Sequence, residues 1–189
     1  MECLLLVVLI GCVVFLLNNT FKKATSYRLK LFYVIFTLEH FFTSGFFAFF
    51  LTHFSNINDP HDFYKMAHTA DSWFGLFGLG HSFIAFLIYP LVKIGIGVEL
   101  LFILFSTISY VGFLGYFRLI GFYKMEKVHG MFLLFFFIPT IHVWTGFLGK
   151  EPLLLLLMMY LLKMIKGDIN YVYTCMILML IFLIRPHVA

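Results

Sequence analysis

The chain has 189 residues, of which 62% are hydrophobic and 12% are charged, and its formal net charge is +4. A soluble domain is about half apolar and a quarter charged, so this composition excludes an ordinary soluble domain and predicts an integral membrane protein. The positive charge does not indicate nucleic-acid binding, because the basic residues are scattered between apolar runs. The three cysteines lie inside apolar runs and predict neither a disulfide framework nor a CxxC metal site: Cys3, Cys12 and Cys175.

Seven apolar runs follow one another along the chain, and each must be helical in lipid because unpaired backbone groups have no water to bind there. The first run has no basic segment before it and no small-residue cleavage site after it, so it is interpreted as a retained membrane helix. The predicted fold is all-α: one membrane domain over residues 1–189, a bundle of about six transmembrane helices plus one interfacial or re-entrant helix. The runs are 2–18, 31–54, 73–92, 97–117, 129–148, 152–165 and 170–184.

The basic residues predict which ends of the helices face the cytoplasm. The connection after the first run carries four of them, Lys22, Lys23, Arg28 and Lys30, and is therefore expected inside. If residues 73–92 span the membrane, the basic residues divide 7 inside to 6 outside, whereas without that span they divide 9 to 4. The second division is more asymmetric and favours an interfacial or re-entrant helix on the outer side.

Residues 73–92 also carry small or polar residues at helical spacing, which supports the interfacial interpretation, although hydropathy alone favours a span. These residues are Gly75, Gly78, Ser82, Ala85 and Tyr89. The favoured topology places three polar segments on one outer face: the acidic stretch 55–73, the Gly149-Lys150-Glu151 segment and the Arg185-Pro186-His187 segment.

The last two runs are shorter than the roughly 20 residues that normally span a bilayer. The sequence between them, "KMIKGDIN", holds the Gly and Asn typical of a helix reversal. These runs predict a short hairpin. The chain then stops without a polar tail, and we expect an N-terminal fragment of a longer protein.

The segment Gly149-Lys150-Glu151-Pro152 has a structural and a functional interpretation. In the structural one, Gly149 ends a helix, Pro152 stands in the first turn of the next and Glu151 meets the positive end of its dipole. Lys150 then simply reaches the headgroups. In the functional one, Lys150 binds an anionic group, and Glu151 orients it or acts as a base.

The segment Arg185-Pro186-His187 ends the last apolar run. An arginine at bilayer depth costs roughly 2.5–3.5 kcal/mol on insertion scales, so it is a functional candidate. Pro186 should push Arg185 out of the helical conformation and end the helix. The guanidinium is suited to bidentate phosphate binding. The alternative is an arginine at the water interface that closes a helix.

The acidic stretch permits acid–base chemistry, although it is also compatible with a solvated connection. Asp62 with Tyr64, and Asp71 with Trp73, each pair a carboxylate with an aromatic ring, as sugar-binding sites often do. Four histidines lie nearby, but no HxxxH or HxH spacing occurs, so no metal site is predicted. Further histidines are expected to be hydrogen-bonded within the bundle: His40, His129 and His142.

"FIPTIHVWTGFLGKEPL", followed about 35 residues later by "IRPH", resembles a pattern of bacterial multi-spanning polysaccharide (O-antigen-type) polymerases and GT-C-type lipid-linked-sugar glycosyltransferases. The early outer loop of that family often reads Asp-x-x-Tyr-x-x-Ala. "DFYKMA" approaches this pattern with Asp62, Tyr64 and Ala67, off by one spacing. The resemblance covers residues 60–189. The matching motif residues are Pro139, Trp144, Gly149, Lys150, Glu151, Arg185, Pro186 and His187.

The resemblance implies an enzyme of the bacterial cytoplasmic (inner) membrane that moves a sugar from a polyprenyl-linked donor to an acceptor at the outer face. Asp62, Asp71 or Glu151 would be the general base. Lys150, Arg185 and His187 would bind the phosphate or pyrophosphate. No metal and no cofactor is expected. The expected partners are the lipid bilayer and a lipid-linked saccharide, with no nucleic acid. The alternatives are a transporter or flippase for an anionic lipid or solute, and a non-catalytic membrane subunit.

Overall fold

The computed structural model describes residues 2–54, 59–122, 135–167 and 170–186. Within these ranges the chain forms eight α-helices and one short 3-10 helix, with no strand. The predicted all-helical fold is therefore confirmed for the described residues. The elements are α1 (Glu2–Lys23), α2 (Tyr27–Phe54), α3 (Asp59–Thr69), η1 (Phe74–Leu76), α4 (His81–Lys93), α5 (Val98–Leu119), α7 (Pro139–Gly146), α8 (Glu151–Lys166) and α9 (Tyr171–Ile184).

Three of the described helices, α1, α2 and α5, are long and apolar enough to cross a membrane, judged by length and composition. At 1.5 Å per residue, the 22 residues of α1 or α5 extend about 33 Å, against a hydrocarbon core of about 30 Å. Helices α8 and α9 have 16 and 14 residues and remain shorter than this span. Their shortness agrees with the prediction made for the last two apolar runs.

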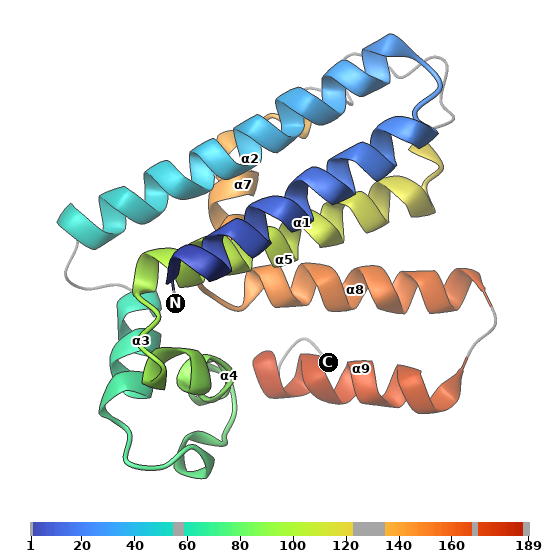
Figure 1. The fold of residues 1–189 in the computed structure, drawn as a ribbon. Coiled ribbons are helices and arrows are strands. Elements are labelled where there is room, and N and C mark those ends of the chain that lie inside the picture. The colour runs from blue at the N-terminus through green and yellow to red at the C-terminus, as the bar shows by residue number, and fades with distance from the viewer. Residues whose placement is uncertain (1, 55–58, 123–134, 168–169, 187–189) are drawn as a thin grey trace.

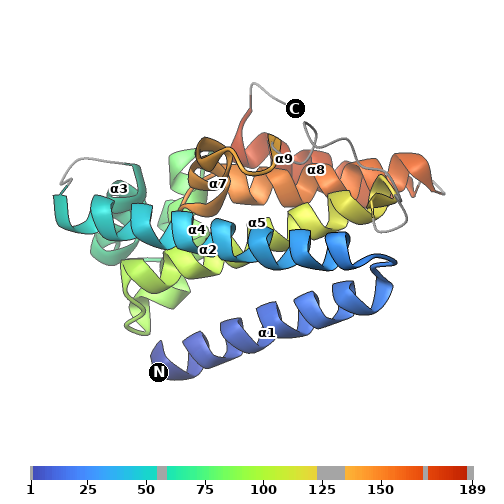
Figure 2. The same ribbon diagram turned by 90° about the horizontal axis from the view of Figure 1, so that it is seen from above.

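Helix α5 lies at the centre of the bundle. Of its most apolar stretch 67% of the residues are buried, compared with 11% for α1. Helices α1 and α2 run antiparallel on one side of α5, and α8 and α9 form a hairpin on the other side (Figure 1). Figure 2 shows α1 on the outside of the bundle, next to α2. An element that is apolar all round, as α5 is, fits this central place.

Residues 73–92 do not run the length of the bundle. They contain η1, a loop and most of α4, which has only 13 residues and includes Pro90. Helices α3 and α4 lie side by side at one end of the bundle (Figure 1). The expected stripe of small and polar residues is not on one helix, because Gly80 has a φ of 63° and separates the loop from α4. Only its last three members lie on α4: Ser82, Ala85 and Tyr89.

The acidic stretch was expected to be a polar connection, and the structure corrects this with helix α3. Its buried residues Pro60, Phe63 and Ala67 follow a helical spacing and pack into the core. Asp59 and Asp62 stand in its first turn, where carboxylates meet the positive end of the helix dipole.

The apolar run 129–148 is not one continuous helix, which corrects a further expectation. Its residues 129–134 lie outside the described part. Residues 136 and 137 form a turn, and Ile138 is extended with ψ of 113°, as expected for a residue before proline. Pro139 then begins α7, which has eight residues.

The reversal between α8 and α9 has the predicted residues at its two ends. Gly167 follows the last turn of α8, and its N–H donates to the carbonyl oxygen of Lys163 at 3.2 Å. The Asn170 side chain accepts a hydrogen bond from the N–H of Tyr173 at 3.3 Å and caps α9. The predicted helix hairpin is therefore confirmed.

A buried polar cluster joins α2, α5 and α7. His40 and His142 are both fully buried, and their Nδ1 atoms lie 3.0 Å apart. The Nε2 atom of His40 donates to the carbonyl oxygen of Ser106 at 3.0 Å. The prediction that these two histidines are hydrogen-bonded within the bundle is confirmed, while His129 lies outside the described residues. The cluster fixes α7, which leads directly into the candidate site.

Candidate functional site

The charged side chains divide between the two ends of the bundle. The end that carries α3 and α4, here called the α3/α4 end, also holds the start of α8 and the end of α9 (Figure 1). The opposite end, here called the cationic end, holds every other described basic residue. This division matches the predicted one for all basic residues that the structure describes. The described basic residues of the α3/α4 end are Lys65, Lys93, Lys150 and Arg185, and those of the cationic end are Lys22, Lys23, Arg28, Lys30, Arg118, Lys163 and Lys166.

The first residue of α8 and the residue that ends α9 form an ion pair. The Nη2 atom of Arg185 lies 2.7 Å from Oε1 of Glu151, and the side chains are 38% and 25% exposed. Arg185 has φ of −145° and ψ of 89°, so it leaves the helical conformation before Pro186, as predicted. The pair joins two motifs that lie far apart in the sequence.

A small cavity of about 120 Å³ opens beside this ion pair. Lys150 lies on it together with the pair, so the three charged motif residues share one space. Aromatic rings supply much of the remaining wall. The lining residues are Asp59, Phe63, Trp144, Phe147, Gly149, Lys150, Glu151 and Arg185.

The loop before α4 closes against this part of the bundle. The N–H of Gly80 donates to the carbonyl oxygen of Leu183 at 2.8 Å, which ties the loop to the last turn of α9. A Cβ built on Gly80 would lie 3.6 Å from Nζ of Lys150. The ammonium group of Lys150 therefore lies close to the backbone of this loop.

Gly149 allows the backbone to pass close to the carboxylate. A Cβ at this position would lie 3.2 Å from Oε2 of Glu151 and 3.1 Å from the ring of Phe147. Both distances are tighter than ordinary van der Waals contact. Close packing therefore explains why the Gly-Lys-Glu motif has a glycine at this position. Helix α7 ends before it, at Gly146.

The structure brings together only some of the predicted site residues. Lys150, Glu151 and Arg185 line the cavity. Asp62 and Asp71 are exposed and are not among the lining residues, so their catalytic role stays a prediction. His187 lies outside the described residues.

Asp59 is the lining carboxylate that the sequence reasoning did not select. It precedes Phe63 by four residues on α3, so the two side chains lie on one face of the helix, and both line the cavity. That spacing to a large aromatic residue is the signal that could have identified it. Asp59 is exposed and, among the described residues, makes no ion pair.

The cations of the cavity can donate hydrogen bonds to an anion. Two cations, Lys150 and Arg185, face two carboxylates, Asp59 and Glu151, around one small cavity. Within the described part of the chain, the ion pair uses one guanidinium nitrogen of Arg185, and a guanidinium carries five N–H donors. Further N–H groups can therefore bind a second anion beside Glu151.

Of the motif residues that carry the family resemblance, five line this cavity: Trp144, Gly149, Lys150, Glu151 and Arg185. No protein-family model, curated protein or solved structure matches the chain.

Proposed function

We propose that this chain is an integral membrane glycosyltransferase, of the polysaccharide-polymerase kind, that acts on a polyprenyl-linked sugar donor at the outer membrane face. The observation that carries the proposal is the cavity at the α3/α4 end, where Lys150 and Glu151 meet Arg185. These residues come from the two motifs of the family resemblance. A chance similarity of two short motifs would not require them to share one site.

The small size of the cavity supports a role in binding only the phosphate part of the donor. Sites that enclose a whole drug-sized ligand have volumes of roughly 300–1,000 Å³. The cavity of about 120 Å³ is too small for a lipid-linked saccharide. We infer that the phosphate or pyrophosphate enters it, while the polyprenyl chain lies in the bilayer and the sugar faces the aqueous side.

The proposed reaction is a single displacement at the anomeric carbon. The acceptor hydroxyl oxygen forms a bond to that carbon, and the bond from the carbon to the phosphate oxygen breaks. Asp59, which is free of an ion pair within the described residues, takes the hydroxyl proton as general base. Lys150 and Arg185 stabilise the negative charge that the leaving phosphate gains. Glu151 positions Arg185 through their hydrogen bond.

The exposed surface supports insertion into a membrane. Large apolar side chains are exposed along α1, α2 and α9. In water such continuous apolar faces would lead to aggregation, whereas in a bilayer they face lipid tails. Examples, each at least half exposed, are Leu4, Val7, Phe15, Phe42, Phe46, Met176 and Met179.

The charge division predicts the orientation of the bundle, with the cationic end in the cytoplasm. In a variant without Cys3, Cys12 and Cys175, a cysteine at His68 should react with a membrane-impermeant maleimide in intact cells. A cysteine at Lys30 should react only after the cells are opened. Both positions are exposed, so a difference reports sidedness rather than burial. Labelling of Lys30→Cys but not His68→Cys in intact cells would place the candidate site inside and contradict the proposal.

Replacement of Arg185 by lysine tests phosphate binding. Lysine keeps the charge but lacks the planar guanidinium, which can donate two parallel hydrogen bonds to a phosphate. The variant should therefore lose at least one charge-assisted hydrogen bond to the phosphate. The expected cost is about 1.5–3 kcal/mol, or roughly 10- to 150-fold in the rate of glycan-chain assembly. Membrane levels of the variant should remain normal, because insertion costs for arginine and lysine are similar.

The matched control is Lys65→Arg on α3, a cation at the same end that does not line the cavity. It should leave assembly unchanged. Binding of farnesyl diphosphate to the purified proteins, followed by thermal stabilisation in detergent, separates binding from turnover. Normal assembly and normal stabilisation by farnesyl diphosphate in Arg185→Lys would show that Arg185 only closes α9.

A further inference from the structure

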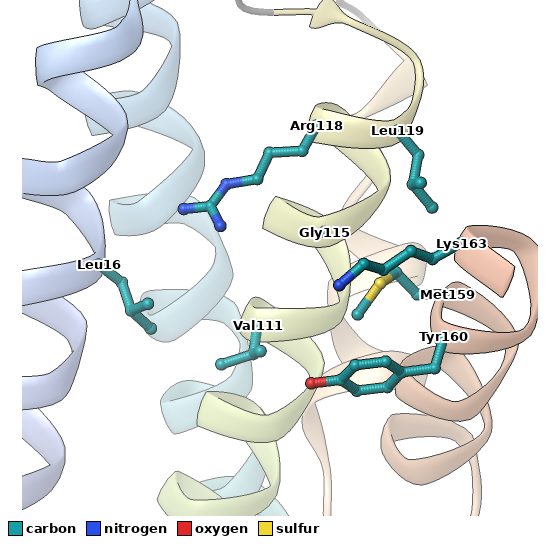
Figure 3. Close-up of a pocket in the computed structure, with 8 residues that line it drawn as sticks. All are labelled: Leu16, Val111, Gly115, Arg118, Leu119, Met159, Tyr160 and Lys163. Carbon is teal, nitrogen blue, oxygen red and sulfur yellow. The ribbon is translucent and has the colours of Figure 1, made fainter. Parts of the chain in front are cut away.

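A second cavity, of about 250 Å³, lies near the cationic end between α1, α5 and α8. Helix α5 forms its back wall, and α1 and α8 flank it (Figure 3). It is separate from the candidate site, which lies at the other end of α8. The lining residues are Leu16, Val111, Gly115, Arg118, Leu119, Met159, Tyr160 and Lys163.

The lining combines an apolar wall with two cations. Figure 3 shows the guanidinium of Arg118, the ammonium of Lys163 and the hydroxyl of Tyr160 directed towards the same space. The side chains of Leu16 and Val111 face that space from two different helices. The cavity is therefore amphipathic, because hydrogen-bond donors and hydrocarbon side chains line the same space.

Neither cation has a hydrogen bond or an ion pair with another described residue, which distinguishes them from a nearby lysine. Lys166 donates from Nζ to the carbonyl oxygen of Leu119 at 2.5 Å and so completes the C-terminal end of α5. Arg118 and Lys163 are exposed and lie on the cavity. Their side-chain donors are therefore available to an anion that enters the cavity.

The wider charge at this end supports the same conclusion. Seven described basic residues gather at the cationic end, and no described carboxylate lies there with them. Of the described acidic residues, Glu39 lies in the interior of α2 and the others belong to the α3/α4 end. The described charges at this end therefore attract anions. Anionic lipid headgroups of the cytoplasmic leaflet are anions of this kind.

We propose that this cavity binds one anionic glycerophospholipid from the same leaflet. Its phosphate lies between Arg118 and Lys163 and accepts a hydrogen bond from Tyr160, and one acyl chain follows the apolar wall along Leu16 and Val111. A neighbouring cavity between α1, α2 and α5 is lined by apolar residues and one threonine, without a cation. That cavity lacks the charges that would select an anionic headgroup. The lipid site is independent of the proposed glycosyl transfer at the α3/α4 end.

Native mass spectrometry of the purified chain in a neutral detergent tests the site. The probes are dioleoyl phosphatidic acid, dioleoyl phosphatidylcholine and inorganic phosphate. One molecule of phosphatidic acid should remain bound at concentrations where the other two do not. The double variant Arg118→Gln/Lys163→Gln should bind it about 25-fold more weakly. The expected weakening corresponds to a loss of about fivefold in affinity, or about 1 kcal/mol, for each cation removed.

Three further variants make the result specific. Lys23→Gln/Lys30→Gln removes the same charge from the same end without touching the cavity, and it should leave the bound phosphatidic acid in place. Val111→Phe keeps both cations but fills the apolar wall, so it should weaken the lipid without creating a preference for phosphate. Lys163→Gln alone, at an exposed position, should give the fivefold effect if the double variant folds poorly.

Three outcomes would overturn the proposal. Equal weakening by Lys23→Gln/Lys30→Gln would indicate diffuse attraction without a site. Binding of inorganic phosphate as strong as that of phosphatidic acid would indicate a free-phosphate site. Retention of phosphatidic acid by both Lys163→Gln and Val111→Phe would exclude this cavity.

Discussion

Replacement of Asp59 by asparagine should lower the rate of glycan-chain assembly by about 10²- to 10⁴-fold, the usual contribution of a general base. Asp59 lines the same cavity as Lys150 and Arg185, and it is free of an ion pair within the described residues. Asparagine has nearly the same shape but cannot accept the proton of the acceptor hydroxyl. The binding of farnesyl diphosphate should remain within a few fold of the parent protein, because the cations proposed to bind the phosphate, Lys150 and Arg185, are unchanged.

Asp62→Asn is the matched control, since Asp62 lies in the same first turn of α3 but does not line the cavity. Assembly should be retained in this variant. The sequence favoured Asp62 and Asp71 over Asp59, so the comparison also decides between the two assignments. A strong defect in Asp62→Asn or Asp71→Asn, with normal assembly in Asp59→Asn, would refute the role proposed for Asp59.

The choice between Asp59 and Asp62 depends on the rotation of α3 about its axis, which the sequence alone did not reveal. That rotation is set by the buried residues Pro60, Phe63 and Ala67. Phe63 and Ala67 belong to the same core cluster as residues of α4 and α5. The sequence shows that these residues are apolar, but not which neighbours cover them. Because the stretch was interpreted as a loop, no helical face was assigned to its carboxylates.

The shared location of Lys150, Glu151 and Arg185 was easier to predict from the sequence than the choice between Asp59 and Asp62. The count of basic residues predicted the side of the membrane on which each helix end lies, and two helices that end on one side bring their terminal residues to one surface. The count of basic residues did not predict the ion pair between Glu151 and Arg185. An ion pair also requires that α8 and α9 are neighbours and that the two side chains lie at the same level in the bundle. In the sequence only two residues separate Gly167 from Asn170, which keeps α8 and α9 close together.

Helix lengths were less predictable where a turn interrupts an apolar run. Hydropathy does not distinguish one long helix from a turn followed by a short one, and this explains the error over 129–148. Pro139 was visible in the sequence, but proline is compatible with a kink as well as with a new helix start. The sequence also did not reveal that Arg118 and Lys163 share a cavity, and they were counted only as two cytoplasmic charges. Their convergence on one cavity depends on the packing of α8 against α5.

Enlargement of Gly146 should destabilise the bundle strongly, because α7 approaches α2 and α5 most closely there. A Cβ at this position would overlap the hydroxyl oxygen of Ser44 and lie 3.0 Å from its Cβ and 3.1 Å from Oγ of Ser106. Both serines are buried in the His40–His142 cluster and have little room to move. We expect Gly146→Ala to lower the free energy of unfolding by about 1–3 kcal/mol and Gly146→Val by about 3 kcal/mol or more. Unfolding by sodium dodecyl sulfate in mixed micelles, followed by circular dichroism, measures both values.

Gly45→Val is the control for this series, because a Cβ at Gly45 would meet no atom within 4 Å. Valine also has a higher helix propensity than glycine, so this variant should be neutral or slightly stabilising. In a Ser44→Ala background the cost of Gly146→Ala should fall, since the overlapping oxygen is gone, and the difference gives the coupling between the two helices. Equal stability of Gly146→Val and Gly45→Val would mean that α7 does not pack closely on α2. The buried linker that leads from α7 to Lys150 and Glu151 would then have no fixed support, and the candidate cavity would lose its geometric basis.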